Sequence, residues 1–363
     1  FYVPIYSSVS GTYKGIVKRM HNSLRPQNHM VIECDFKQTK VQSFAPLDWQ
    51  SATREACVDF VKNAGIVGLG GAGFPTYVKY MKPDGVDYVL INAVECEPYI
   101  TADYRSVMDD AKDLVTGAKI MKKMAEAKTV YICIKESHPD LIEKVKSVLT
   151  DAAGVEVRPV PDVYPMGWER VLVREVLHKE YGGLPAEAGA IIGNASSAIA
   201  IAKAFEKGEA ITQKNLTVSG ECVKDPHNVC VPVGMPVSEI IEACGGYTQD
   251  TVRLISGGPM MGKTIVNDMF VVDRAMNALT VLPAANDDAI ACLRCGKCSD
   301  HCPSGLQPVR ITAALKANDV DEMSKRGVMS CIECGMCTYI CPSHIDVTEN
   351  VRKAKRIVML KKK

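Results

Sequence analysis

The sequence predicts a multidomain α/β protein that ends in an α-helical ferredoxin domain. Its 363 residues are too many for one ordinary hydrophobic core. In the middle of the chain, short apolar segments alternate with helical ones, which is typical of a doubly wound parallel sheet. Near the C-terminus stand two complete C-x2-C-x2-C-x3-C-P runs, which is the spacing of bacterial 4Fe-4S cluster ligands.

Composition excludes some classes of function. The 43 Lys and Arg residues nearly balance the 42 Asp and Glu residues, so the net charge of +1 gives no sign of nucleic-acid binding. The sequence contains no run of 18 apolar residues, which is about the length that a helix needs to span a bilayer. Eight of the 15 cysteines lie in motifs that need free thiolates, and no signal peptide is visible. We therefore expect a cytoplasmic protein, alternatively one held peripherally on the cytoplasmic face of a membrane.

The two cysteine runs predict two clusters that lie close together. In this spacing three cysteines surround one face of a cubane, whereas the fourth, ahead of a proline, ligates the other cluster. Structural zinc is the competing interpretation, but a zinc site closes with four ligands and does not require this third cysteine and x3-C-P ending. We assign Cys292, Cys295, Cys298 and Cys341 to one cluster, and Cys331, Cys334, Cys337 and Cys302 to the other.

The segment between the two runs favours an α-helical ferredoxin domain over a compact βαβ one. Residues 309–316 and 319–325 both have helical patterns. The last residues of the chain, 351–363, form a basic amphipathic stretch, which could contact an anionic membrane or an acidic partner, or could be a solvated helix end.

A glycine-rich loop follows a helical pattern over residues 54–63. Residues 65–73 contain five glycines in nine positions, so their backbone N–H groups could cradle a phosphate. The spacing matches neither a Walker motif nor a G-x-G-x-x-G after a strand, so the loop alone is weak evidence for nucleotide binding.

Polar residues follow the first predicted strand of the central sheet. This strand, at 88–92, ends in a polar loop that runs to Asp103, and ligands bind at such carboxyl ends in open α/β sheets. A helix over 107–127, a second strand at 129–134 and a third at 154–160 continue the alternation.

Five features lie in order along the whole chain: Gly68–Thr76, Asn92–Asp103, Gly182–Pro185, Gly257–Gly262 and the two cysteine runs. Together they resemble the C subunit of the Rnf complex, a family related to the flavin subunit of respiratory complex I. The resemblance implies that the chain binds FMN and uses NADH.

The same resemblance implies which residues contact the cofactors, and it assigns none as catalytic. Lys79 is implied as a partner of the FMN phosphate or ring, and Phe74 as a stacking surface for nicotinamide or adenine. Without the resemblance, other roles remain open for these residues. Asn92 could only cap a turn, Glu95 and Glu97 could be solvated, and Phe74 could belong to the core. The other implied FMN contacts are Gly68, Gly70, Gly71, Gly73, Asn92, Glu95, Glu97 and Asn194.

This chain departs from the complex I pattern at two places. Leu69 stands where the complex I flavin protein has Arg, and Gly167-Trp168-Glu169 replaces its Gly-Glu-Glu element, which leaves the NADH contacts there undefined.

We expect four domains. Residues 1–45 resemble part of a lipoyl-like barrel-sandwich domain that lacks a lipoylation lysine, and we expect further N-terminal structure before Phe1. Residues 46–207 form the FMN- and NADH-binding α/β domain, 208–285 a soluble ligand-binding β-grasp domain, and 286–363 the two-cluster ferredoxin domain.

The resemblance implies an electron-transfer function. The chain would pass electrons between NADH and a ferredoxin-type carrier through FMN and two 4Fe-4S clusters. Its partners would be NAD(H), other electron-transfer subunits and a membrane-embedded, ion-translocating complex. One alternative is a soluble NADH-dependent electron donor to a reductase such as proline reductase. Another is a flavin-free ferredoxin-like relay and docking protein. The direction of electron flow, the coupled ion and the oligomeric state stay open.

Overall fold

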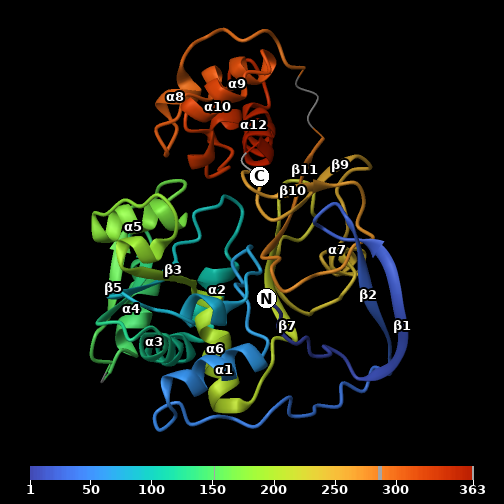
Figure 1. The fold of residues 1–363 in the computed structure, drawn as a ribbon. Coiled ribbons are helices and arrows are strands. Elements are labelled where there is room, and N and C mark those ends of the chain that lie inside the picture. Colours follow the sequence, from blue (N-terminus) through green and yellow to red (C-terminus); the bar gives the residue numbers. More distant parts are fainter. Residues whose placement is uncertain (151, 285–287, 362–363) are drawn as a thin grey trace. The chain divides into compact units, whose positions relative to one another are not determined.

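The computed structural model describes residues 1–150, 152–284 and 288–361. The chain divides into two compact units, each with its own hydrophobic core (Figure 1). The first unit comprises Phe1–Gly258 and Lys263–Pro283, and the second comprises Pro259–Gly262 and Ala284–Lys363.

A four-stranded parallel sheet forms the centre of the first unit, with the strand order β5-β4-β3-β6. Alternate side chains of each strand enter different cores. Val89 and Ile91 of β3 pack with helices α1, α3 and α6, whereas Leu90 packs with α5 on the opposite face (Figure 1). The strands are β3 (Tyr88–Ala93), β4 (Thr129–Lys135), β5 (Val155–Val160) and β6 (Ala190–Asn194).

Helices cover both faces of this sheet, as the alternating pattern predicts. They are α1 (Arg54–Asn63), α2 (Ala102–Asp109), α3 (Ala111–Ala125), α4 (Pro139–Ser147), α5 (Glu169–Leu177) and α6 (Ala195–Lys207), with short 3-10 turns at Thr76–Tyr80 and Pro185–Ala188. Gly117 of α3 lies against α6 so closely that a Cβ there would stand 2.0 Å from the Ala198 carbonyl oxygen. The glycine therefore permits this close helix pair.

The expected single helix over 107–127 is wrong, because the chain breaks at Asp110. This residue leaves the helical region, with φ −114° and ψ 34°, and separates α2 from α3. Its carboxylate instead accepts a hydrogen bond from Lys203 of α6 at 2.6 Å. The ion pair joins the break to the helix that leads away from β6.

The β-grasp region forms a second, mixed sheet with the order β10-β9-β11-β7-β8, and its core packs against helix α7. Strand β7 pairs antiparallel with β8 and parallel with β11. Its elements are β7 (Gln213–Ser219), β8 (His227–Pro232), α7 (Val237–Ala243), β9 (Val252–Ser256), β10 (Lys263–Ile265) and β11 (Ala278–Pro283).

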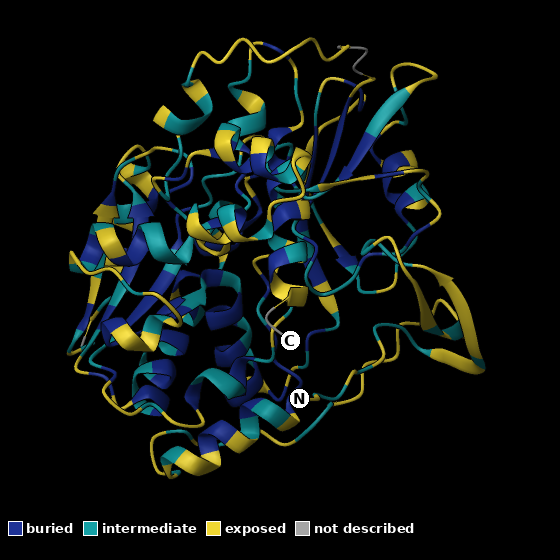
Figure 2. Ribbon diagram, turned by 45° about the horizontal axis from the view of Figure 1, so that its top comes forward, coloured by how far each residue is buried: buried dark blue, intermediate teal, exposed yellow. Residues whose placement is uncertain are grey.

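The N-terminal segment contributes an antiparallel hairpin of β1 (Gly11–Met20) and β2 (Pro26–Cys34). Figure 2 shows the hairpin as mostly exposed, in contrast to the buried interior of the central sheet.

The described residues of the second unit form helices and turns, with no strand among them, so the prediction of an α-helical ferredoxin domain is confirmed. The helices are α8 (Lys297–Asp300), α9 (Pro308–Lys316), α10 (Val320–Lys325), α11 (Met336–Tyr339) and α12 (Val347–Lys361), with a 3-10 turn at Val328–Ser330. Within the described parts of both units, no helix has the length and apolar character needed to cross a membrane.

Candidate functional site

The glycine-rich loop closes on itself through the backbone. The N–H of Gly68 donates to the carbonyl of Phe74 at 2.8 Å, and the N–H of Gly73 donates to the carbonyl of Gly68 at 3.1 Å. Gly71 and Gly73 have φ values of 110° and 60°, which glycine adopts without the strain that a side chain would bring. The sequence therefore needs glycine at these two positions.

The loop lies against the start of helix α6. The N–H of Leu69 donates to Ser197 Oγ at 2.9 Å, and a Cβ on Gly70 would stand 2.8 Å from Asn194 Nδ2. Within the described chain, the N–H groups of Gly70, Gly71 and Ala72 donate to no protein group. These exposed donors, next to a helix N-terminus, fit an anionic group such as a phosphate.

Asn92 and Asn194, which both belong to the predicted site, are paired neighbours on strands β3 and β6. Asn194 also caps α6, since its Oδ1 accepts from the Ser196 N–H at 2.9 Å. Asn92 Nδ2 donates to the carbonyl of Gly167 at 2.6 Å. The two asparagines therefore define the carboxyl edge of the sheet, where the open α/β architecture places ligands.

Asp103 connects this edge to helix α2. Its two carboxylate oxygens accept from Asn194 Nδ2 and Ser196 Oγ, both at 2.6 Å. Glu95 caps the same helix end by accepting from the N–H groups of Asp103 at 2.8 Å and Tyr104 at 3.0 Å. Burial, and after it the Asp103 charge, raises the pKa of Glu95 to about 8.

Lys79 and Phe74 lie on the outer part of the predicted site. Lys79 Nζ donates to the Ile192 carbonyl at 2.8 Å and pairs with Glu169 at 3.2 Å. The Phe74 side chain is exposed, and its ring meets Phe1 edge-on with centroids 6.3 Å apart. An exposed aromatic ring beside the loop is compatible with a stacking role.

Glu97 and Cys96 belong to the same strand-end loop but differ in their surroundings. Glu97 packs against Gly258, where an added Cβ would stand 2.1 Å from its Cγ. Cys96 Sγ accepts from the N–H of Gly167 at 3.2 Å, and burial raises its pKa to about 11. The thiol is therefore neutral at physiological pH and is not activated as a nucleophile.

Sequence reasoning missed four polar residues at this place. Asp103, Ser196 and Ser197 follow the strand ends and could have been found from that position. Lys214 comes from the β-grasp region, and no local motif marks it. Its Nζ donates to the Leu69 carbonyl at 2.8 Å.

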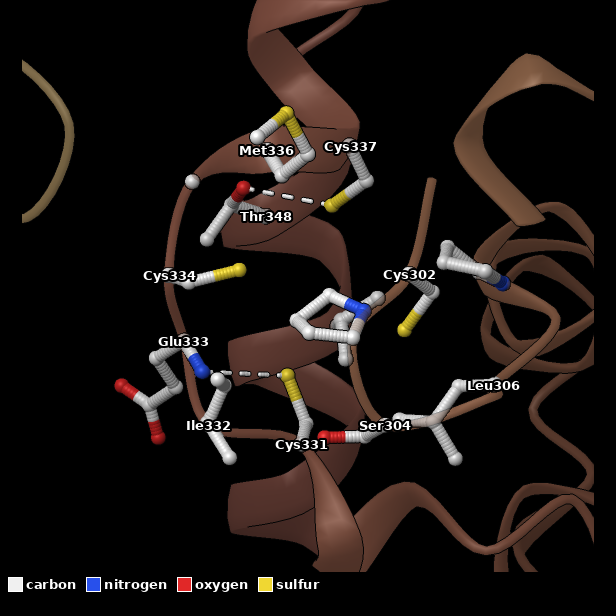
Figure 3. A pocket seen from close by; sticks show the side chains of 14 residues that line it. Cys302, Ser304, Leu306, Cys331, Ile332, Glu333, Cys334, Met336, Cys337 and Thr348 are labelled. Atoms are coloured by element: carbon white, nitrogen blue, oxygen red, sulfur yellow. Dashed lines mark hydrogen bonds between the residues drawn. The ribbon is translucent and has the colours of Figure 1, made fainter. Parts of the chain in front are cut away.

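The second cysteine motif lines one pocket together with the last cysteine of the first. Figure 3 shows the sulfur atoms of Cys331, Cys334, Cys337 and Cys302 directed into the same space, among Leu306, Ile332 and other side chains. These are the four cysteines that we assign to one cluster, although Cys302 lies far from the others in the sequence. The Glu333 N–H donates to Cys331 Sγ at 3.4 Å, as a backbone amide can do to a cluster ligand.

The first motif is held beside the end of the second. The Ile290 N–H donates to the Ser343 carbonyl at 3.1 Å, and Ser343 Oγ donates to the Ala291 carbonyl at 3.2 Å. These bonds bring the Cys292 loop to the residues that follow Cys341. Of the first motif's ligands, Cys292 and Cys295 are exposed.

The two cysteine loops share a backbone conformation. Arg294 and Glu333 occupy equivalent positions with φ values of 54° and 57°, and Gly296 and Gly335 follow with 82° and 79°. At Gly335 a Cβ would stand 2.4 Å from the Met260 carbonyl oxygen, so that loop needs glycine for space as well. Equal conformations indicate that both loops are built for the same kind of ligand.

The geometry favours clusters over zinc. A zinc ion requires its ligands about 2.3 Å from one point, whereas a cubane holds its four thiolates farther apart. Four cysteines line one pocket, which is the ligand number of a cubane, and each motif has a third cysteine and an x3-C-P ending that zinc does not require.

Comparison with protein-family models assigns three domains. Residues 61–203 match the Nuo51 FMN-binding domain, residues 215–264 match the SLBB domain, and residues 284–342 match a 4Fe-4S dicluster domain. FMN and two iron-sulfur clusters, which the sequence predicts, are thus confirmed as the cofactors of these domains.

The fold is also found in a solved structure. The NAD+-reducing [NiFe]-hydrogenase in its H2-reduced state aligns with a TM-score of 0.57 over 90% of this chain and 66% of that chain, at 15% sequence identity. At this identity the likeness concerns the fold alone, and it confirms the predicted fold class.

Curated relatives are similar over most of the chain. The C subunit of the proton-translocating ferredoxin:NAD+ oxidoreductase complex of Clostridium ljungdahlii is 35% identical, over 84% of this chain and 68% of the relative. The C subunit of the Na+-translocating ferredoxin:NAD+ oxidoreductase complex of Acetobacterium woodii is 35% identical, over 99% and 83%. The C subunit of the ion-translocating oxidoreductase complex of Rhodobacter capsulatus is 37% identical over 77% of this chain, which spans 56% of that relative. The chain therefore belongs to the family of C subunits of Rnf-type ion-translocating oxidoreductase complexes.

Proposed function

We propose that this chain passes electrons between NADH and a ferredoxin-type carrier, as the NADH-side subunit of an Rnf-type ion-translocating complex. One observation carries the proposal. The same chain combines two features. One is a loop at the carboxyl edge of a parallel sheet, in which three backbone N–H groups have no partner among the described residues, and the other is a unit in which cysteines of two motifs line one pocket. NADH exchanges two electrons as a hydride and clusters exchange one at a time, and bound FMN supplies the conversion between them.

The residues of the first unit would bind and orient the flavin. The N–H groups of Gly70, Gly71 and Ala72, together with the N-terminus of α6, would hold its phosphate. Asn92 and Asn194 would present amide groups to its polar edge from β3 and β6. Glu95 is mostly protonated at pH 7, because its pKa is raised to about 8, so it adds little negative charge beside an anionic cofactor.

The outer residues would receive the nicotinamide nucleotide. The exposed ring of Phe74 offers an apolar surface on which a planar base can stack. Lys79 is oriented by Ile192 and Glu169, so its ammonium group has a defined position beside strand β6. We assign these two residues to binding and orientation, and we assign no residue to proton transfer.

The cysteines of the second unit would hold the clusters in the cross-ligated arrangement. Cys331, Cys334, Cys337 and Cys302 would hold one, and Cys292, Cys295, Cys298 and Cys341 the other. The shared pocket supports the first set, and the bonds between Ser343 and residues 290–291 support the second. We further propose that other subunits of the complex hold the chain at the cytoplasmic face of the membrane, since the relatives are named as subunits of such complexes.

Anaerobic purification followed by absorption spectroscopy tests this function. Iron, acid-labile sulfide and released flavin would be quantified on one sample, and spectra recorded before and after NADH. We expect about eight iron atoms and about one FMN per chain, with the flavin and cluster absorption bleached together by NADH. About eight iron atoms without flavin or any response to NADH would leave only a cluster relay. Zinc without sulfide would overturn the cluster assignment.

A further inference from the structure

Lys214 is a buried lysine that the proposed function leaves without a role. It lies on β7 of the β-grasp region, and only 4% of its surface is exposed. Its Nζ donates to the Leu69 carbonyl oxygen at 2.8 Å, across to the glycine loop of the α/β domain. A lysine is seldom buried so completely unless its charge is compensated.

The charge of Lys214 is only partly compensated by protein groups. An ammonium group has three donors, and within the described chain one of them has a partner and no carboxylate forms an ion pair with it. Burial lowers the pKa of Lys214, against the opposing effects of Asp103 first, and then of Asp273 and Glu95. Asp103 is already bound by Asn194 and Ser196. An anion near Lys214 would therefore lower the cost of its burial.

The contact with Leu69 also fixes the direction of the next peptide N–H. In a trans peptide the carbonyl of one residue and the N–H of the next point in opposite directions. Because the Leu69 carbonyl is held by Lys214, the Gly70 N–H must point away from Lys214. That N–H belongs to an exposed residue and has no partner in the described chain. Ser197 Oγ holds the other side of Leu69, by accepting from its N–H at 2.9 Å.

The loop has no charged side chain of its own. Residues 65–76 contain neither an acidic nor a basic residue. Lys79 follows the loop, but its ammonium group is bound by the Ile192 carbonyl and by Glu169. Two basic side chains contact the loop backbone in the described chain. Arg274 Nη1 donates to the Gly65 carbonyl at 2.8 Å, at the start of the loop, whereas Lys214 contacts the carbonyl that directly precedes the Gly70 N–H.

We propose that Lys214, supplied by the β-grasp region, is a positioning residue of the flavin site, which directs the Gly70 N–H toward the cofactor phosphate and complements its negative charge. This inference rests on the proposed function, because it requires a phosphate-bearing flavin in the glycine loop. It makes the β-grasp strand a part of the cofactor site.

Comparison of FMN with riboflavin tests the proposal, because riboflavin lacks the phosphate. The Kd of each flavin would be measured by fluorescence quenching on flavin-depleted protein that retains its clusters. In Lys214→Met we expect the FMN Kd to rise tenfold or more and the riboflavin Kd to change less than threefold. In Lys214→Arg, which keeps the charge and donors, the FMN Kd should stay within about threefold of the wild type. Lys207→Met is the matched control, since Lys207 of α6 pairs with Asp113 at 3.1 Å and should leave both constants unchanged.

Each other outcome has a definite meaning. An unchanged FMN Kd in Lys214→Met, or equal losses for FMN and riboflavin, would overturn the positioning role, since a merely structural lysine would affect both flavins alike. If Lys214→Met does not fold, Lys214→Gln replaces it as the uncharged variant, with the same expected Kd values and the same outcomes against the inference. Wild-type protein that binds no FMN would instead overturn the proposed function, and the inference with it.

Discussion

Gly70 and Asn194 contact each other so closely that a Cβ on Gly70 would stand 2.8 Å from Asn194 Nδ2 and 3.0 Å from its Cγ. We expect Gly70→Ala to displace the Asn194 side chain, which caps α6 and binds Asp103, and so to weaken FMN binding at least tenfold. Fluorescence titration with FMN would measure the loss.

Gly68→Ala is the matched control for this variant, because the Gly68 N–H is bound to the Phe74 carbonyl within the loop and is not one of the donors proposed to hold the phosphate. A Cβ at Gly68 would lie 3.7 Å from its nearest neighbour, which is an ordinary van der Waals contact, so FMN binding should change little. Equal losses in both variants would mean that the loop resists any added side chain, and the specific contact with Asn194 would then not be the cause.

Glu95 should make the stability of the first unit depend on pH. Its folded-state pKa is about 8 against an ordinary value of 4.5, so the folded protein holds a proton that the unfolded chain releases between these values. Stability from this group is complete below about pH 4.5 and is lost as pH rises through 8, by at most on the order of 5 kcal/mol. In flavin-depleted protein, Glu95→Gln should flatten the decline of Tm between pH 5.5 and 8.5. A variant whose Tm falls as steeply as that of the wild type would contradict the assignment.

Asp103 contributes to this effect, after burial, through its negative charge. We therefore expect Asp103→Asn to lower the folded-state pKa of Glu95, so that the decline of Tm with rising pH is smaller and ends at a lower pH than in the wild type. The same pH series of thermal unfolding measures the change. Glu55→Gln serves as a control, because Glu55 is an exposed residue of α1. If Glu55→Gln changed the pH dependence of Tm as much as Asp103→Asn, the cause would be a general charge effect.

Cross-ligation predicts that substitution of the fourth cysteine of either motif leads to loss of the cluster that the other motif holds. Cys302 shares a pocket with the cysteines of the second motif, so Cys302→Ser should lower iron from about eight to about four atoms per chain by losing that cluster. Cys341→Ser should lose the other. Anaerobic iron analysis with EPR of the reduced proteins would detect four fewer irons and the loss of coupling between the clusters.

Cys230→Ser is the control for the cluster variants, since Cys230 lies on the β-grasp strand β8 and outside both motifs. Its iron content should equal that of the wild type. If Cys302→Ser and Cys341→Ser gave the same residual EPR spectrum, the assignment of different clusters to the two cysteines would be refuted.

Local patterns predicted most of the elements that position the sites. The apolar runs at 88–92, 129–134 and 154–160 predicted β3, β4 and β5 closely, because buried parallel strands need continuous apolar residues. The cysteine spacing is a local feature of a few residues, so the sequence alone predicted the ligands of both clusters. The break at Asp110 was not predicted, since Lys203, with which its carboxylate pairs, lies on another helix and cannot be found from the local pattern.

The contact of Lys214 with the glycine loop was also beyond local reasoning. The contact forms because the β-grasp sheet packs on the α/β domain, and a single lysine within a strand pattern does not indicate such packing. Asp103 lay within a segment that the resemblance included, but its bonds to Asn194 and Ser196 depend on how α2 and α6 meet. The site residues that sequence reasoning missed are therefore those whose positions depend on contacts between elements far apart in the sequence.

The exchange of cysteines between the two motifs has a consequence for how the second unit stays folded. Its core is small, with nine buried apolar side chains from Leu306 to Val358. With the proposed ligation, one cluster ties Cys302 to Cys331 and the other ties Cys292 to Cys341, so the two inorganic groups act as nested cross-links around α9 and α10. Oxidative loss of either cluster would remove one of these cross-links. The loss of iron would therefore also destabilise the fold of the whole second unit.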